Sequence, residues 1–216
     1  MKYKCLVFDH DDTIVNSTAT IHYPCFQEYL NIYYPGEKLT LDEYFQKNFT
    51  KGFLNLCKEY HMTDEQIEKE EEFWRDYVQK HIPDAYPGIK EIMERHKSEG
   101  GIITVVSHSL KENILRDFKH NNLPQPDLVY GWELPKELRK PSDYPLKQIM
   151  STFNLNPEDL LVIDDAKPGY DMAKKCNVKF AAVGWANNVT EIEDFMHKNC
   201  DIYLKEVNDL KKYLGY

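Results

Sequence analysis

Short runs of apolar residues, each ending at polar or turn-forming residues, recur along much of this chain. The first run covers residues 4–8, and the others follow only after residue 100. Short apolar runs that are bounded by turn residues are typical of buried strands. The sequence therefore predicts strands at residues 4–8, 102–106, 128–131, 160–163, 178–183 and 201–204.

Helical patterns separate these runs in the C-terminal part of the chain. They predict helices at residues 89–98, 111–121, 146–153 and 170–176 and from residue 207 onward. Strands that alternate with helices at this spacing form a parallel sheet covered by helices on both faces. We therefore expect an α/β fold with a Rossmann-like core.

The segment between the first two predicted strands differs, because its patterns are helical throughout. Helices are expected at residues 23–33, 41–49, 53–60 and 64–81. Thr63 and Gln66 form a capping box before the last of these, and the acidic run at residues 70–72 indicates a solvent-exposed helix face. We predict that residues 16–85 form an inserted helical cap, hinged near 16–19 and 83–87. Residues 1–15 and 86–216 would form the core.

Acidic residues gather at the carboxyl ends of two predicted strands. Asp9 and Asp11 follow the first strand, and Asp164 and Asp165 follow the strand at 160–163. Neighbouring carboxylates repel one another unless a cation lies between them. Ligands of open α/β sheets also bind at this edge. The two pairs therefore predict a Mg²⁺ site that includes a carboxylate free to react.

Two further polar segments lie between the acidic pairs. Ser107 and His108 follow the strand at 102–106, and Lys140 precedes Pro141 ahead of a helix. A hydroxyl and free N–H groups at a strand end can hold phosphate oxygens, and a lysine can neutralise phosphoryl charge. Alone, such a serine is usually a cap and such a lysine a surface residue. Their order between the acidic pairs favours a shared site.

Composition narrows the range of partners. The chain has 216 residues, of which 42% are hydrophobic and 29% charged, and a formal net charge of −9 at pH 7. This charge argues against nucleic-acid or membrane partners, which require a basic surface. The five cysteines are scattered without a C-x-x-C spacing, which indicates reduced thiols. Because the chain begins directly before its first strand, we expect no signal peptide and a cytoplasmic protein.

The polar segments, in this order, resemble the motifs of the haloacid dehalogenase (HAD)-like hydrolase superfamily, whose members include phosphotransferases. Residues 9–13 match its D-x-D-x-T motif, Ser107 its strand-ending serine, Lys140-Pro141 its lysine motif and Asp164-Asp165 its last acidic motif. The chain resembles the phosphoglycolate phosphatase-like and β-phosphoglucomutase-like members, which have a helical cap, although residues 16–85 contain no motif of the family. His10 replaces an apolar or small residue of the family, and the resemblance implies no role for it.

The resemblance implies a role for each matching residue. Asp9 would be the nucleophile that becomes an aspartyl phosphate, and Asp11 would protonate the leaving group and then activate water. Lys140 would bridge Asp9 and the phosphoryl group. The implied phosphate-binding residues are Ser107, His108 and Thr13, and Thr13 would also orient the Asp11 loop. The implied Mg²⁺ ligands are Asp9, Asp11 through its backbone carbonyl, Asp165 and, adjacent to them, Asp164.

These roles describe a Mg²⁺-dependent phosphatase that hydrolyses a small phosphorylated metabolite, as a monomer or weak homodimer. A haloacid dehalogenase would not need the acid at Asp11. A sugar phosphomutase typically has a histidine twelve residues after its nucleophile, where this chain has Ile21, with His22 one residue beyond. A non-catalytic phosphate-binding protein with the same fold is a further alternative.

The sequence leaves the phosphate ester open, because the cap would select it. Lys47, Lys51, His22 and Tyr23 are cap residues that could face the site. For residues of these types, solvent exposure or packing within the cap is the more common explanation.

Overall fold

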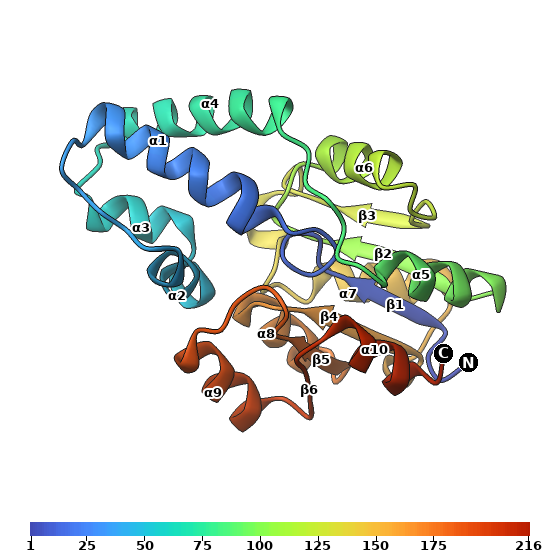
Figure 1. Ribbon diagram of the computed structural model, residues 1–216. Helices are drawn as coiled ribbons and strands as arrows, with labels where there is room; N and C mark the ends of the chain where they lie inside the picture. The colour runs from blue at the N-terminus through green and yellow to red at the C-terminus, as the bar shows by residue number, and fades with distance from the viewer.

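A six-stranded parallel sheet forms the centre of the molecule in the computed structural model (Figure 1). The structure describes residues 1–216, apart from the side chains of Thr50 and Lys51. The strand order is β3-β2-β1-β4-β5-β6, so the direction of strand addition reverses beside β1. The strands are β1 (Cys5–Phe8), β2 (Ile102–Val106), β3 (Leu128–Tyr130), β4 (Leu160–Asp164), β5 (Lys179–Val183) and β6 (Ile202–Leu204).

Both faces of the sheet are buried beneath helices, which explains why its strands are apolar throughout. In β1, Leu6 and Phe8 pack on one face, and Cys5 and Val7 pack on the other. The first face is covered by α5 (Ile89–Ser98), α6 (Lys111–His120) and α10 (Val207–Leu214). The second face is covered by α7 (Tyr144–Phe153), α8 (Lys167–Lys175) and α9 (Thr190–Asn199). The predicted α/β fold is confirmed.

Two core helices begin earlier than predicted. α7 begins at Tyr144 and α8 at Lys167, whereas the sequence placed their starts at residues 146 and 170. Pro145 and Pro168 lie in the first turn of these helices. Proline suits this position because the N–H that it lacks would have no helical partner there. The two prolines therefore belong to the helices and not to the preceding loops.

The segment between β1 and α5 is helical, as predicted (Figure 1). Its elements are η1 (Thr18–His22), α1 (Tyr23–Tyr33), α2 (Leu41–Lys51), α3 (Phe53–Glu59) and α4 (Asp64–Lys80). Phe26, Tyr29 and Leu30 of α1 centre an apolar cluster that is separate from the two clusters of the core. Thr63 and Gln66 form the predicted capping box of α4. Among the described residues, no helix has the length and apolarity needed to cross a membrane.

The acidic run at residues 70–72 is not uniformly exposed, so the prediction for it is wrong at one position. Glu71 and Glu72 are exposed, but Glu70 is 3% exposed. Successive helical residues point in directions about 100° apart, so a run of charges on an amphipathic helix turns one member toward the buried face.

The cap leaves and re-enters the core through two segments that lie side by side. The Asn16 N–H donates to the Asp84 carbonyl at 3.0 Å, and the Tyr86 N–H donates to the Ile14 carbonyl at 2.9 Å. These bonds join the two ends of the insert close to the loop that follows β1. The division into residues 1–15 and 86–216 against 16–85 stays a prediction, and the position of these contacts supports it.

Candidate active site

Three neighbouring strands bring predicted site residues to one edge of the sheet. Asp9 follows β1, Ser107 follows β2 and Asp164 ends β4. β1 pairs with both β2 and β4, and Phe8 is level with Ile163 in the second pairing. The residues that come next in those two strands, Asp9 and Asp164, are therefore neighbours. This edge, beside the reversal in strand order, is where open α/β sheets bind ligands.

Lys140 links these two aspartates. Its Nζ donates at 2.7 Å to Asp9 Oδ1 and at 2.7 Å to Asp164 Oδ2, and its side chain is 3% exposed. Burial lowers the pKa of Lys140, but the two carboxylates outweigh burial and raise this pKa above its ordinary value. Lys140 is therefore a buried, positively charged bridge between Asp9 and Asp164.

The start of α8 holds Asp164 in place. The Ala166 N–H donates to Asp164 Oδ1 at 2.8 Å, so both carboxylate oxygens of Asp164 have protein partners. Gly169 lies against the same carboxylate, and a Cβ atom at this position would lie 2.1 Å from Asp164 Oδ2. The close approach of the helix to the carboxylate therefore requires glycine here.

Asp9, Asp164 and Asp165 form a carboxylate cluster that suits a metal ion. One oxygen from each lies within 4.8 Å of the other two. Burial and then the neighbouring aspartates raise the pKa of Asp165 well above its ordinary value. Burial likewise raises the pKa of Asp164 to about 7, against the influence of Lys140. Hard oxygen ligands fit Mg²⁺, and a cation would relieve this repulsion. Because Asp164 already has two partners, Asp9 and Asp165 are better placed to bind an ion.

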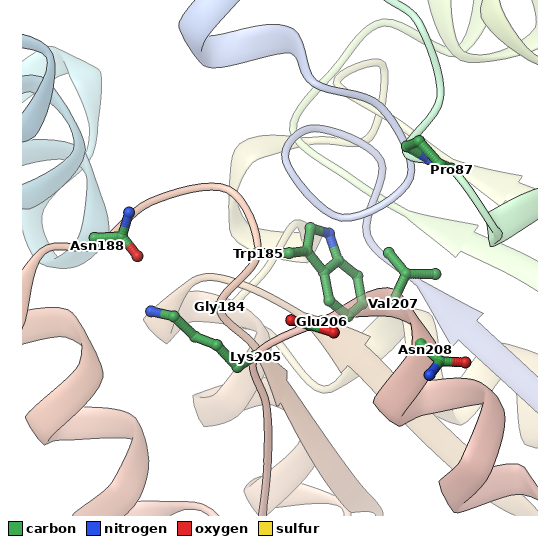
Figure 2. Close-up of a pocket in the computed structure, with 8 residues that line it drawn as sticks. All are labelled: Pro87, Gly184, Trp185, Asn188, Lys205, Glu206, Val207 and Asn208. Carbon is green, nitrogen blue, oxygen red and sulfur yellow. The ribbon is translucent and has the colours of Figure 1, made fainter.

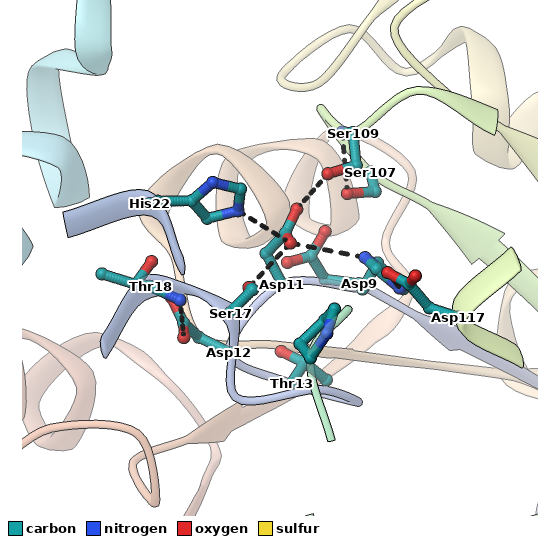
Figure 3. Close-up of polar contacts among 12 residues, drawn as sticks. Asp9, Asp11, Asp12, Thr13, Ser17, Thr18, His22, Ser107, Ser109 and Asp117 are labelled. Carbon is teal, nitrogen blue, oxygen red and sulfur yellow. Dashed lines mark hydrogen bonds and ion pairs between the residues drawn. The ribbon is translucent and has the colours of Figure 1, made fainter. Parts of the chain in front are cut away.

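Asp11 occupies different surroundings, formed by hydroxyl groups and imidazoles (Figure 3). The Ser17 hydroxyl donates to Asp11 Oδ1 at 2.7 Å, the Ser109 hydroxyl donates to Oδ2, and His22 Nε2 lies 3.2 Å from Oδ1. Burial raises the pKa of Asp11, but His10 and His22 outweigh burial and hold this pKa well below its ordinary value. The surroundings of Asp11 therefore favour its ionised form, and the carboxylate accepts several hydrogen bonds.

His22, the last residue of η1, connects Asp11 to the cap helix α4. The indole N–H of Trp74 in α4 donates to His22 Nδ1 at 3.1 Å. Because Nδ1 accepts this bond, the ring proton lies on Nε2, which can then donate to Asp11. His22 therefore packs within the cap, against Trp74, and in addition contacts Asp11 of the candidate site.

Two of the other candidate cap residues, Tyr23 and Lys47, make contacts within the cap. The Tyr23 hydroxyl donates to the Leu39 carbonyl at 2.8 Å, which is a contact within the cap. Lys47 of α2 forms an ion pair with Glu59 of α3. The side chain of Lys51 lies outside the described residues.

The three predicted phosphate-binding residues make different contacts. The buried Ser107 hydroxyl accepts a hydrogen bond from the Ser109 N–H at 3.1 Å. His108 is exposed, and its Nε2 lies 3.0 Å from the Lys140 carbonyl oxygen. The Thr13 hydroxyl donates to Asp165 Oδ1 at 3.4 Å. The described contact of Thr13 thus orients a metal-site carboxylate, and the Asp11 side chain is held by other residues.

The sequence did not single out Asp12, which shapes the loop between β1 and η1. Asp12 adopts a left-handed backbone conformation, with φ of 60°, and is 4% exposed. Its Oδ1 accepts a hydrogen bond from the Thr18 N–H at 3.1 Å. Aspartate tolerates this conformation better than most residues and can form hydrogen bonds to nearby backbone. A turn-favouring residue type at this position was therefore the feature of the sequence that could have identified Asp12.

A separate open groove of about 440 Å³ lies beside the loops that follow β5 and β6 (Figure 2). Its lining includes Trp185, Lys205 and Glu206, together with Pro87 from the cap joint. None of the predicted site residues lines it. The groove is therefore separate from the carboxylates for which the sequence predicts chemistry.

A comparison with family models identifies the chain. The model described as haloacid dehalogenase-like hydrolase matches residues 6–183, which is most of the chain. The protein belongs to the haloacid dehalogenase-like hydrolase family. Among curated proteins, none matches this sequence.

Solved structures share the fold at low sequence identity. A protein described as a predicted phosphoglycolate phosphatase, from Haemophilus somnus, superposes with a TM-score of 0.80 at 19% identity, covering 99% of each chain. A protein assigned as a β-phosphoglucomutase, from Bacteroides vulgatus, gives 0.77 at 19% identity, over 99% of this chain and 88% of that one. CbbY from Rhodobacter sphaeroides, in complex with xylulose-1,5-bisphosphate, gives 0.73 at 16% identity, over 95% of each chain.

Proposed function

We propose that this protein is a Mg²⁺-dependent phosphatase that hydrolyses a small phosphate monoester through an aspartyl phosphate at Asp9. The observation that carries the proposal is the separate placement of two carboxylates on one loop. Asp9 is paired with a buried lysine beside two further aspartates, whereas Asp11 lies among hydroxyl groups and imidazoles. Different surroundings allow two carboxylates to perform different tasks.

In the first step, an Asp9 carboxylate oxygen attacks phosphorus as the bond from phosphorus to the ester oxygen breaks. The leaving oxygen takes a proton from Asp11, so the products are an alcohol and an aspartyl phosphate. In the second step, water attacks the same phosphorus and gives a proton to Asp11. The bond from phosphorus to Asp9 then breaks, which releases phosphate, restores the Asp9 carboxylate and leaves Asp11 protonated for the next turnover.

Asp11 must hold a proton before the first step, although its surroundings favour the ionised form in the ligand-free protein. A phosphate ester that arrives beside it adds negative charge. Like charge raises the pKa of a carboxyl group, so substrate binding favours protonation of Asp11. We therefore expect the groups around Asp11 to set its pKa, and the bound substrate is one of these groups.

Mg²⁺ would supply positive charge that offsets repulsion between Asp9 and the phosphoryl oxygens. Asp9, Asp165 and the Asp11 backbone carbonyl would hold it, with Asp164 beside them. Lys140 would neutralise charge shared between Asp9 and the phosphoryl group, whose oxygens Ser107 and adjacent N–H groups would bind. The neighbours described as a phosphoglycolate phosphatase and bound to xylulose-1,5-bisphosphate support a small phosphorylated substrate.

A sugar phosphomutase is the second candidate, because His22 contacts Asp11 from one residue beyond the position that a mutase typically uses. The two functions differ in their products. Incubation with a hexose 1-phosphate yields free sugar and inorganic phosphate from a phosphatase, but hexose 6-phosphate from a mutase. A phosphatase therefore releases phosphate in step with the loss of ester.

The proposal is tested by turnover of p-nitrophenyl phosphate with and without Mg²⁺. We expect Mg²⁺-dependent release of nitrophenolate, and a loss of at least about 10³-fold in Asp9→Asn, which keeps the shape of the side chain but not its nucleophile. Asp76→Asn on the exposed side of α4 is the matched control and should retain activity. Near-parental turnover in folded Asp9→Asn would contradict the assignment, and a parent that binds phosphate without turnover would be a binding protein.

A further inference from the structure

His10, the residue between the two aspartates of the first motif, is a buried imidazole held between two carboxylates. It is 1% exposed. Its Nδ1 lies 3.4 Å from Asp11 Oδ1, and its Nε2 lies 3.4 Å from Asp117 Oδ2. Neither nitrogen makes a well-aligned hydrogen bond with a described residue. A buried polar ring that lacks aligned partners costs stability, so its position calls for an explanation beyond packing.

Asp117 extends this contact away from the proposed site. It lies on α6 and is 2% exposed. The neighbouring Arg116 donates through Nε to Asp117 Oδ1 at 2.8 Å. One carboxylate oxygen of Asp117 therefore faces His10 and the other is fixed by Arg116, which limits rotation of the Asp117 side chain.

Arg116 also reaches the cap. Its Nη1 donates to the Val78 carbonyl oxygen at 2.7 Å, in the last turn of α4. Carbonyls in the last turn of a helix have no partner within the helix, so this contact satisfies one of them. A chain of contacts thus runs from Asp11 through His10, Asp117 and Arg116 to the backbone of α4.

The side chains that make these contacts line a small cavity between the cap and the core, next to Asp11. A displacement of α4 would act on Arg116 and reach Asp11 through two buried side chains, in addition to the shorter route through Trp74 and His22.

We propose that His10 is a positioning residue for Asp11, held by Asp117 and tied through Arg116 to the cap helix α4. This inference rests on the proposed function, since it concerns the group that protonates the leaving oxygen. It gives a role to a residue of the first motif for which the family resemblance implied none. It also makes proton donation depend on the position of the cap.

Leaving-group dependence separates positioning from a general structural role. The ratio kcat/KM reports the first irreversible step, in which Asp9 is phosphorylated. Nitrophenolate leaves without much help from a proton, whereas an alkoxide needs one. Loss of Asp11 positioning should therefore lower kcat/KM for an alkyl phosphate more than for p-nitrophenyl phosphate. A general loosening of the loop would lower both values equally.

The test compares the parent protein with His10→Asn, His10→Gln and Arg116→Met, using p-nitrophenyl phosphate and glycerol phosphate. The asparagine amide nitrogen can replace Nδ1 and keep the contact with Asp11, whereas the glutamine amide can replace Nε2 and keep only the contact with Asp117. We expect His10→Gln to lower kcat/KM for glycerol phosphate at least about tenfold more than for p-nitrophenyl phosphate. His10→Asn should retain most of the glycerol phosphate activity.

Arg116→Met tests the connection with the cap in a variant that is expected to fold, because Arg116 is partly exposed. Its matched control is Arg95→Met, which removes an arginine paired with Glu99 on the outside of α5. We expect the preference for the nitrophenyl ester to increase in Arg116→Met and to stay at the parental value in Arg95→Met.

Equal losses with both esters in the His10 variants would overturn the positioning role. A parental preference in Arg116→Met would overturn the connection with α4. A parent protein that turns over neither ester would contradict the proposed function itself, and the inference with it. An active parent with unchanged preference in every variant leaves the proposed function intact and removes only this inference.

Discussion

Asp9 and Asp11 lie on one short loop, but the side chains around them differ in kind. A buried lysine shares its charge between Asp9 and Asp164. Asp11 accepts hydrogen bonds from the Ser17 hydroxyl, at the start of η1, and from the Ser109 hydroxyl, in the loop after β2. Different surroundings of this kind allow two carboxylates to perform different chemical tasks. The division of labour that we propose therefore follows from the surroundings of each carboxylate.

Asp165 is the carboxylate whose loss should weaken metal binding with least effect on the rest of the site. Its pKa is raised by burial and by three other aspartates, so its charge is stable only with a cation nearby. We expect Asp165→Ala to raise the Mg²⁺ concentration for half-maximal activity by about tenfold or more. Mg²⁺ titrations of activity in the variant and the parent would measure this. Superimposable curves would exclude Asp165 as a ligand.

Gly169 should tolerate no side chain. A methyl group there would displace the Asp164 carboxylate and break its contact with Lys140. We expect Gly169→Ala to lower the free energy of unfolding by about 1–3 kcal/mol and to reduce turnover. Denaturant unfolding and phosphatase assays would measure both effects.

The control for Gly169→Ala is Gly100→Ala. Gly100 has a φ of +80° but open space around its Cβ position. Its substitution should lower stability through backbone strain and leave turnover unchanged. If Gly169→Ala behaves in the same way, the close approach to Asp164 has no effect on the site.

The sequence predicted the residues that strand geometry brings together, but not those that meet through tertiary contacts. Asp9, Ser107 and Asp164 could be predicted because parallel strands end at one edge. Ser109 donates to Asp11 across 98 positions of sequence. A single sequence contains no signal for such a contact, because many serines could occupy that place. His10 likewise could be seen only as an exception to the family pattern.

The cap helix α4 reaches the proposed site through two intermediate side chains. It contributes Trp74 to His22 and the Val78 carbonyl to Arg116. Its ends were predicted almost correctly, because a capping box fixes its start. Its orientation could not be predicted, since only the fold decides which of three successive glutamates turns inward. The short helix η1 was also missed, because it has no apolar periodicity of its own.

Glu70 should make the stability of the protein depend on pH. Burial, and then the charge of Glu71, raise the pKa of Glu70 to about 8, against roughly 4.3 in an unfolded chain. Between these values the folded state holds a proton that the unfolded state has released. Stability therefore decreases as pH rises through this window, and the full penalty is present above pH 8.

We expect Glu70→Gln to remove this penalty. The variant should match the parent near pH 4 and become more stable than the parent by up to about 1 kcal/mol per pH unit up to about pH 8. Chemical denaturation across this range measures the difference. The control, Glu72→Gln on the exposed side of α4, should not change the slope. A constant difference between Glu70→Gln and the parent would show that folding does not raise the pKa of Glu70.

Across the molecule, the cap and the core meet at two adjacent joints and at a packed aromatic contact. Phe49 of α2 lies against Phe195 of α9, with ring centroids 5.3 Å apart. The joints are hydrogen-bonded to each other through Asn16 and Asp84. A cap held in this way can rotate as a unit about its joints, which would close the site over a substrate and exclude water.

We expect beryllium fluoride, a phosphoryl analogue, to slow hydrogen exchange in residues 16–19 and 83–87 when Mg²⁺ is present. The joints would stop opening once the analogue occupies the site. Exchange measured by mass spectrometry on the whole protein tests this, with a peptide that covers residues 154–159, before the amino end of β4, as an internal control. Equal exchange with and without the analogue would contradict closure at these joints.

The most direct measurement is the identification of the residue that carries the phosphoryl group during turnover. The protein would be mixed with a phosphate ester and Mg²⁺, quenched in acid within the first turnovers, digested and analysed by mass spectrometry. The mechanism predicts a phosphorylated peptide that contains residues 4–16, with the group on Asp9, and its absence in Asp9→Asn. Phosphatase turnover with the group on another residue, or undiminished turnover in Asp9→Asn, would contradict the assignment of Asp9 as the nucleophile.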